Sequence, residues 1–205
     1  MIETIENSLQ IAVLLVCTGF AAARAVTRRS RADTFLALLY CSWALGDLYW
    51  MTCLAFFGRT PQVPLVSDLS WYASYLFLYM LLRQVSPADE NTKSGLLPWL
   101  GYVFTGVMAV FYMTWGKILG NLIYAGLMGL LLFASIRRLT GGKGSRSRSC
   151  LPMAVILFCL LEYGLWTVSC FWEGSTLANP YYWFDILLTL CFPAFLLIVE
   201  KEARA

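Results

Sequence analysis

The chain has 205 residues, of which 60% are hydrophobic, and its mean hydropathy is +0.68. A soluble domain is about 45–50% apolar, so the composition excludes a soluble globular protein. The formal net charge of +3 comes from Lys and Arg residues that flank apolar segments, so it does not indicate a nucleic-acid partner.

Apolar segments of about 20 residues recur along the chain, which is the length that crosses the hydrocarbon core of a bilayer as a helix. The strands of an outer-membrane barrel would instead be about 10 residues long with alternating polarity. We therefore predict an all-α, polytopic integral membrane protein with seven transmembrane helices. The predicted spans are Ser8–Val26, Thr34–Phe57, Asp68–Leu82, Leu96–Trp115, Ile118–Ile136, Leu151–Phe171 and Tyr181–Val199. The third span is short if it begins at Asp68, so an alternative start lies nearer Val63.

The distribution of basic residues predicts the orientation. If the N-terminus lies outside, every Lys and Arg except Arg59 and Lys117 lies on the inner side. The positive-inside rule then places the N-terminus outside and the C-terminus in the cytoplasm. We expect the cytoplasmic membrane of a bacterium, because the chain is short and its organisation is simple.

Two parts of the chain resemble each other. "DLYWMTCLAFFG" in the first half and "EYGLWTVSCFWEG" in the second each hold an acid, a tryptophan, a cysteine and a glycine in the same order, and "FAAAR" corresponds to "FASIR". We predict a single transmembrane domain (1–205) with a 3+1+3 parallel repeat: residues 1–85 form one three-helix unit, 96–115 a linker helix, and 117–205 the second unit. The alternative is chance similarity between apolar segments.

Four acidic residues lie within or at the edge of the predicted spans: Asp47, Asp68, Glu162 and Asp185. At a rise of 1.5 Å per residue, Asp47 and Glu162 lie near the middle of the bilayer, and the other two lie near its outer face. A carboxylate in lipid is energetically expensive, so these side chains should face a polar interior.

Aromatic residues lie at helical spacing from these acids, and residues three or four apart share a helix face. Since aromatic ring faces attract positive charge, acids and rings together favour an organic cation. The acids could instead be neutral groups that join helices or cap them, and the rings an interfacial belt. The predicted ligand-binding residues are Asp47, Glu162, Trp43, Trp50, Trp166, Asp68, Asp185, Tyr72 and Tyr75.

The sequence offers little for catalysis. The chain has no histidine, which excludes a Ser/His/Asp triad and a Cys/His zinc site. It also has no P-loop and no dinucleotide-binding fingerprint. We predict no catalytic residue, no metal site and no cofactor, and favour a protein that is not an enzyme.

The stretch "SWALGDLYW" resembles the SWEET and PQ-loop superfamily of small transporters, some members of which carry a Trp-x-x-Gly-Asp on the second span, matched here by Trp43, Gly46 and Asp47. The resemblance implies seven spans in a 3+1+3 repeat. The chain departs from that family because spans one and five contain no Pro-Gln pair.

A second resemblance covers Trp43–Leu82, which looks like the multi-span input modules of some bacterial diguanylate cyclases and implies a stand-alone sensor. The early Gly-Asp is also similar to the lysoplasmalogenase family of small membrane hydrolases, although the histidine expected in that family is absent.

These observations leave three functions open. The first is a small-molecule transport or binding protein with an outward-facing acidic and aromatic cavity, for a cationic solute or coupled to protons. The second is a seven-helix sensor that signals to a partner, and the third is a lipid-directed hydrolase. The expected partners are a small-molecule ligand, the lipid bilayer, and either a second copy of the chain or a signalling protein.

Overall fold

The computed structural model of the chain describes residues 2–59, 61, 65–86, 95–140, 150–172, 174 and 176–204. Within these ranges the chain forms seven α-helices and no strand. The helices are α1 (Ile2–Arg28), α2 (Arg31–Phe57), α3 (Leu65–Val85), α4 (Trp99–Tyr112), α5 (Ile118–Thr140), α6 (Leu151–Phe171) and α7 (Pro180–Arg204). Each helix coincides with one predicted span. α3 begins at Leu65, between the two predicted starts at Asp68 and near Val63. Val63 itself lies outside the described residues.

Local sequence sets both ends of α2. Ser30 is its N-cap, and the hydroxyl oxygen accepts a hydrogen bond from the backbone N–H of Asp33 at 3.2 Å. At the other end Gly58 adopts the left-handed conformation with φ of 63°, and its N–H donates to the carbonyl of Leu54 at 3.0 Å. Glycine adopts this conformation without the steric cost that a Cβ would add, so it ends the helix sharply.

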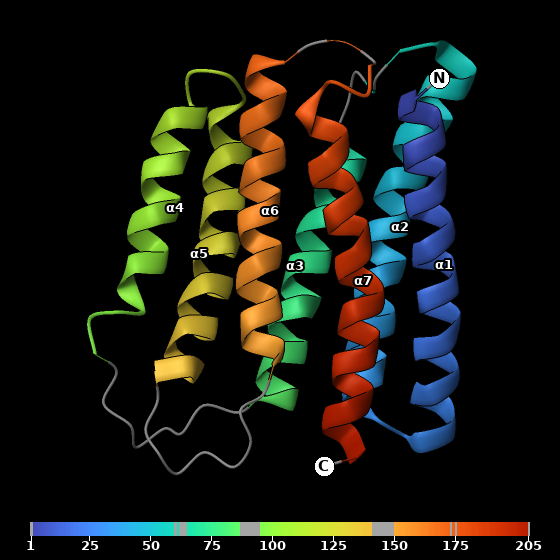
Figure 1. Ribbon diagram of the computed structural model, residues 1–205, viewed down its shortest axis with the longest axis vertical. Coiled ribbons are helices and arrows are strands. Elements are labelled where there is room, and N and C mark those ends of the chain that lie inside the picture. The colour runs from blue at the N-terminus through green and yellow to red at the C-terminus, as the bar shows by residue number, and fades with distance from the viewer. Residues whose placement is uncertain are drawn as a thin grey trace.

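Six helices form a closed ring in the order α1, α2, α3, α5, α6, α7, and α7 packs back against α1. Contacts across the ring join α2 to α7, α3 to α6, and α3 to α7. α4 lies outside the ring against α5, as Figure 1 shows. The helices alternate in direction, so α1, α3, α5 and α7 begin at the end of the bundle that holds the N-terminus. We call this the N-terminal end and the opposite one the C-terminal end.

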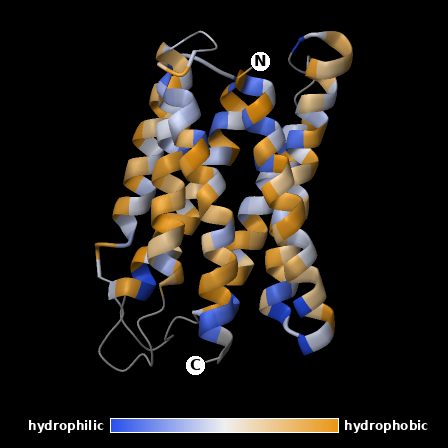
Figure 2. Ribbon diagram, turned by 45° about the vertical axis from the view of Figure 1, so that its right-hand side comes forward, coloured by the Kyte–Doolittle hydropathy of each residue, from blue (hydrophilic) through white to orange (hydrophobic). Residues whose placement is uncertain are grey.

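Among the described residues, five helices are long and apolar enough to cross a membrane: α1, α3, α5, α6 and α7. Figure 2 shows hydrophobic residues along the middle of the bundle and hydrophilic ones gathered toward its two ends. The all-helical prediction is confirmed for the described residues, and these apolar helices indicate an integral membrane protein.

The other two helices differ from the five for separate reasons. α2 has 27 residues, but Asp47 and several Tyr and Trp residues interrupt its apolar stretch. α4 has only 14 residues, or about 21 Å at 1.5 Å per residue, against a hydrocarbon core of about 30 Å. It is shorter than the predicted span because Pro98 precedes it and a turn follows at Met113–Trp115.

Candidate functional site

A cavity of about 390 Å³ lies inside the N-terminal half of the bundle, between α1, α2, α3, α6 and α7. Its volume falls within the range of about 300–1,000 Å³ that is usual for small-molecule sites. The lining residues are Asn7, Gln10, Trp43, Asp47, Trp50, Asp68, Trp71, Tyr75, Glu162, Leu165, Trp166, Ser169, Tyr181 and Asp185.

The lining is buried at its inner part and more exposed toward the N-terminal end. Asp47 is 4% exposed and Glu162 2%, whereas Trp166, one turn nearer that end, is 43% exposed. The cavity therefore runs from the N-terminal end of the bundle into its interior.

Eight of the nine predicted site residues line this cavity, and the exception is Tyr72. The hydroxyl of Tyr72 donates to the backbone carbonyl of Gly120 at 3.2 Å, so this side chain points toward α5. The others come from α2, α3, α6 and α7, which the ring brings together around one space.

Asp47 receives one hydrogen bond, from the indole Nε1 of Trp71 on α3, at 3.0 Å. Gly46 makes this contact feasible, because a Cβ at that position would lie 2.7 Å from the same Nε1 atom. The second carboxylate oxygen of Asp47, Oδ2, is buried and has no hydrogen-bond partner within the described part of the chain. The Gly-Asp pair of the sequence thus places an indole against a carboxylate that keeps an unused acceptor.

Glu162 on α6 accepts a hydrogen bond from the hydroxyl of Tyr75 on α3 at 3.2 Å. The ring of Tyr75 is fixed on both sides, by Trp43 at a centroid distance of 5.7 Å and by Tyr124 at 6.0 Å. Glu162 is therefore held deep in the bundle by a neutral donor that aromatic packing orients.

Asp185 on α7 accepts a hydrogen bond at 3.0 Å from the side-chain amide of Gln10 on α1. The same amide nitrogen lies 3.1 Å from the hydroxyl of Thr189, one turn further along α7. Asp185 is 6% exposed. This third carboxylate is thus held from α1, whereas the donors to Asp47 and Glu162 lie on α3.

The lining carries four carboxylates and, among the described residues, neither Lys nor Arg. In a site of low dielectric constant such an excess of acid attracts cations. The described residues contain no group of three or more Cys, Asp or Glu side chains placed to hold one metal ion. The arrangement suits a cation that needs separate carboxylates and aromatic faces.

An aromatic layer closes the cavity on the side of the C-terminal end. The ring of Trp43 packs edge-on against Phe158 at a centroid distance of 5.5 Å and against Phe192 at 5.2 Å. Phe195, which is fully buried, extends the layer from Phe158 at 5.8 Å. Because these rings come from α2, α6 and α7, they fill the centre of the ring of helices.

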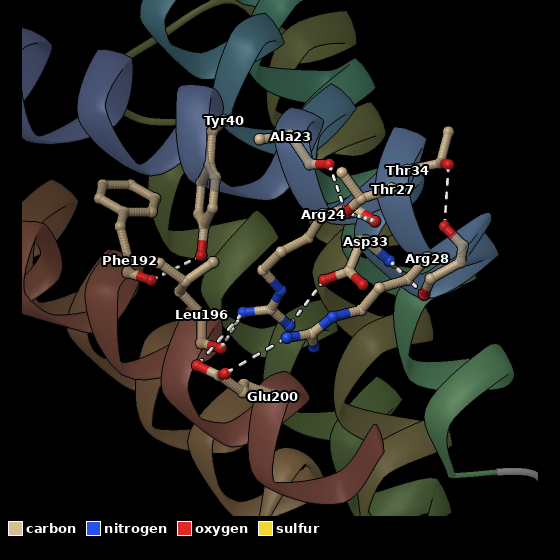
Figure 3. Close-up of polar contacts among 11 residues, drawn as sticks. Ala23, Arg24, Thr27, Arg28, Asp33, Thr34, Tyr40, Phe192, Leu196 and Glu200 are labelled. Atoms are coloured by element: carbon tan, nitrogen blue, oxygen red, sulfur yellow. Dashed lines mark hydrogen bonds and ion pairs between the residues drawn. The ribbon is translucent and has the colours of Figure 1, made fainter. Parts of the chain in front are cut away.

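A cluster of ion pairs lies beyond this layer and joins α1, α2 and α7, as Figure 3 shows. Arg24 lies 2.7 Å from Asp33, which is fully buried, and 3.7 Å from Glu200. The same guanidinium donates to the carbonyl of Leu196 at 3.3 Å. We call Arg24, Arg28, Asp33 and Glu200 the ion cluster; together with the aromatic layer it joins α1, α2, α6 and α7 in the C-terminal half of the bundle.

Six lining residues were not among the predicted site residues: Asn7, Gln10, Trp71, Leu165, Ser169 and Tyr181. Gln10 could have been predicted from the sequence, because an amide side chain inside an apolar span needs a polar partner. Trp71 could be placed on the helix face of Asp68 by its spacing. Its contact with Asp47 depends on how two helices pack, which spacing within one helix does not determine.

Comparison of the chain with known protein families, curated proteins and solved structures gives no match. The resemblances noted in the sequence are therefore neither supported nor opposed by these comparisons, and the site's own chemistry carries the functional argument.

Proposed function

We propose that the protein binds an organic cation in this cavity and carries it across the membrane. The observation that carries the proposal is a buried, aromatic-lined cavity with four carboxylates and no Lys or Arg among its described lining residues. Buried carboxylates without a positive partner are costly. A cationic solute that enters the cavity would supply the missing charge.

The proposal includes seven spans with the N-terminus outside, so that the cavity faces the exterior. The positions of Lys and Arg support this orientation. α2 would cross despite its charged residues, because Asp33 and Asp47 are buried inside the bundle. α4 would cross at the edge of the bundle, where a short helix can be accommodated by local thinning of the bilayer.

The proposal also includes a parallel repeat of α1–α3 and α5–α7. In this repeat α1, α2 and α3 correspond to α5, α6 and α7. The helix pairs that pack together correspond as well: the α1–α2 pair corresponds to the α5–α6 pair, and the α3–α5 pair corresponds to the α7–α1 pair. The contact of α2 with α7 maps likewise onto that of α6 with α3. Gly58 and Gly174, which follow α2 and α6, both have positive φ values. These correspondences support two related units around one central site.

Transport requires that the cavity also open toward the C-terminal end, where the aromatic layer and the ion cluster close it. Pro193 lies within α7 between the cavity residue Asp185 and the cluster residue Glu200. Proline has no N–H to donate to the carbonyl four residues earlier, so α7 can bend there. We propose that bending at Pro193 separates the two halves of α7 during opening.

Flux of a radiolabelled organic cation into proteoliposomes tests the proposal. We expect uptake with the wild type and none with Asp47→Asn/Glu162→Gln, while Tyr72→Phe, which changes a residue outside the cavity lining, retains uptake. Binding of the cation without any flux would reject transport and favour the sensor. Absence of both binding and flux across a panel of amines would reject the proposal.

A further inference from the structure

The three buried carboxylates of the cavity are held as separate points. Asp47, Glu162 and Asp185 each accept from a different donor, respectively Trp71, Tyr75 and Gln10. All three donors are neutral, and each carboxylate is more than nine-tenths buried. Because none of these donors carries charge, carboxylates that ionise here need positive charge from a ligand.

The carboxylates come from α2, α6 and α7, and their donors come from two walls of the cavity, formed by α3 and α1. The donors to Asp47 and Glu162 are both on α3, whereas the donor to Asp185 is on α1. α1 and α3 flank α2 in the ring and do not pack against each other within the described ranges. A ligand that reaches both walls must therefore carry positive groups at two places.

Much of the remaining lining is apolar and aromatic, since it includes Trp43, Trp50, Trp71, Trp166 and Leu165. Trp50 and Trp71 lie with their ring centroids 6.1 Å apart. Indole faces bury methylene groups and also attract ammonium groups. This lining suits a chain of methylenes with an ammonium at each end.

Asp47 gives the strongest sign of a missing partner. Asp47 lines the cavity, and its Oδ2 atom is buried with no donor within the described residues. Glu6, one turn from Gln10 on the same buried face of α1, also has both carboxylate oxygens buried with no donor in that part of the chain. Asp68 is less suitable, because it is only half-buried and lies within electrostatic range of Lys117.

We propose that the ligand is a linear diamine or polyamine, with one ammonium group at Asp185 and another between Asp47 and Glu162. This inference rests on the proposed function and makes its substrate class specific. A monovalent cation would leave buried carboxylates at one wall without a positive partner, whereas a dication serves both walls. The cavity of about 390 Å³ is within the size range of small-ligand sites.

Titration calorimetry on the full chain in phosphatidylcholine nanodiscs tests this inference, since a zwitterionic bilayer does not itself collect polyamines. The probes are 1,4-diaminobutane, spermidine and n-butylamine, the last of which has the same carbon chain as the diamine with one ammonium fewer. We expect the wild type to bind the diamine at least tenfold more tightly than the monoamine. Asp185→Asn should remove most of that preference and leave the affinity for the monoamine nearly unchanged, whereas Tyr72→Phe, which changes a residue outside the cavity lining, should preserve the preference.

The outcomes distinguish failure of the diamine inference from failure of the proposed cation site. Equal affinity for diamine and monoamine in the wild type overturns the inference and leaves the proposed cation site standing. No binding of any amine overturns both. If Asp185→Asn does not fold, Asp185→Glu keeps the charge and should keep the preference. Loss of the preference in folded Asp185→Glu would overturn an ammonium position at Asp185, and the wild-type comparison by itself still decides the inference.

Discussion

The indole of Trp71 on α3 and the carboxylate of Asp47 on α2 form a hydrogen bond of 3.0 Å that crosses between neighbouring helices beside Gly46. The absence of a side chain at Gly46 allows the indole to approach the backbone of α2. The bond occupies one oxygen of the carboxylate, and the other is buried without a donor among the described residues, in a residue that lines the cavity.

Gly46→Ala should therefore displace Trp71. The new Cβ would lie 2.7 Å from the indole nitrogen, closer than atoms approach without moving apart. Overpacking of this kind costs about 1–3 kcal/mol, so we expect a lower melting temperature and weaker amine binding. Gly126→Ala is the matched control, because a Cβ there meets nothing within 4 Å. Equal melting temperatures for the two variants would contradict the contact.

Tyr75→Phe should affect stability more than it affects binding. It removes the hydroxyl that donates to Glu162 at 3.2 Å, and the loss of one buried hydrogen bond costs about 0.5–1.5 kcal/mol. A bound ammonium can replace that donor, so the melting temperature should recover more on amine addition than in the wild type. Thermal unfolding with and without ligand measures this. Loss of all amine binding in Tyr75→Phe would show that the hydroxyl contacts the ligand directly.

The ion cluster leads to a prediction about stability that does not depend on any ligand. Arg24→Gln leaves the fully buried Asp33 without its partner at 2.7 Å. Removing one member of a buried pair costs about 3–5 kcal/mol, whereas replacing both members by apolar residues is often neutral. We expect Arg24→Gln to lower stability strongly and Arg24→Met/Asp33→Leu to recover much of the loss, as measured by unfolding in a denaturing detergent. A double variant as unstable as the single one would mean that Arg24 acts mainly through Leu196 and Glu200.

The helices themselves were largely predictable from the sequence. Hydrophobic length placed all seven, and α6 spans Leu151–Phe171 in both the prediction and the structure. Helical spacing also identified most of the residues that line the cavity, because the acids and the aromatic residues three or four positions away lie on the same helix face. Tyr72 shows the limit of this reasoning: it is four residues from Asp68, yet its hydroxyl reaches Gly120 on α5.

Contacts between helices could not be predicted from the sequence, for a physical reason. The partners of Asp185 and Asp47 are set by which helices are neighbours in the ring and by their vertical offset, and both depend on packing along the whole interface. The ion cluster was missed in the same way, since Arg24 and Asp33 lie on either side of a turn and each alone resembles an ordinary residue at a helix end.

Pro193→Ala separates binding from transport. Alanine restores an N–H that can donate to the backbone of α7, which should straighten and stiffen the helix between the cavity and the ion cluster. We expect unchanged amine affinity by calorimetry and a several-fold slower flux in proteoliposomes. Pro152→Ala, at the first turn of α6 where proline is tolerated, is the control. Flux equal to that of the wild type in Pro193→Ala would remove α7 bending from the account.

The central claim, that Asp47 and Glu162 bind an organic cation, is tested most directly by thermal unfolding of the purified protein against a panel of amines and quaternary ammonium ions. The account predicts that at least one of these cations raises the melting temperature of the wild type and leaves that of Asp47→Asn/Glu162→Gln unchanged, while the variant without ligand is at least as stable as the wild type. No stabilisation of the wild type by any cation, or equal stabilisation of both proteins, would contradict it.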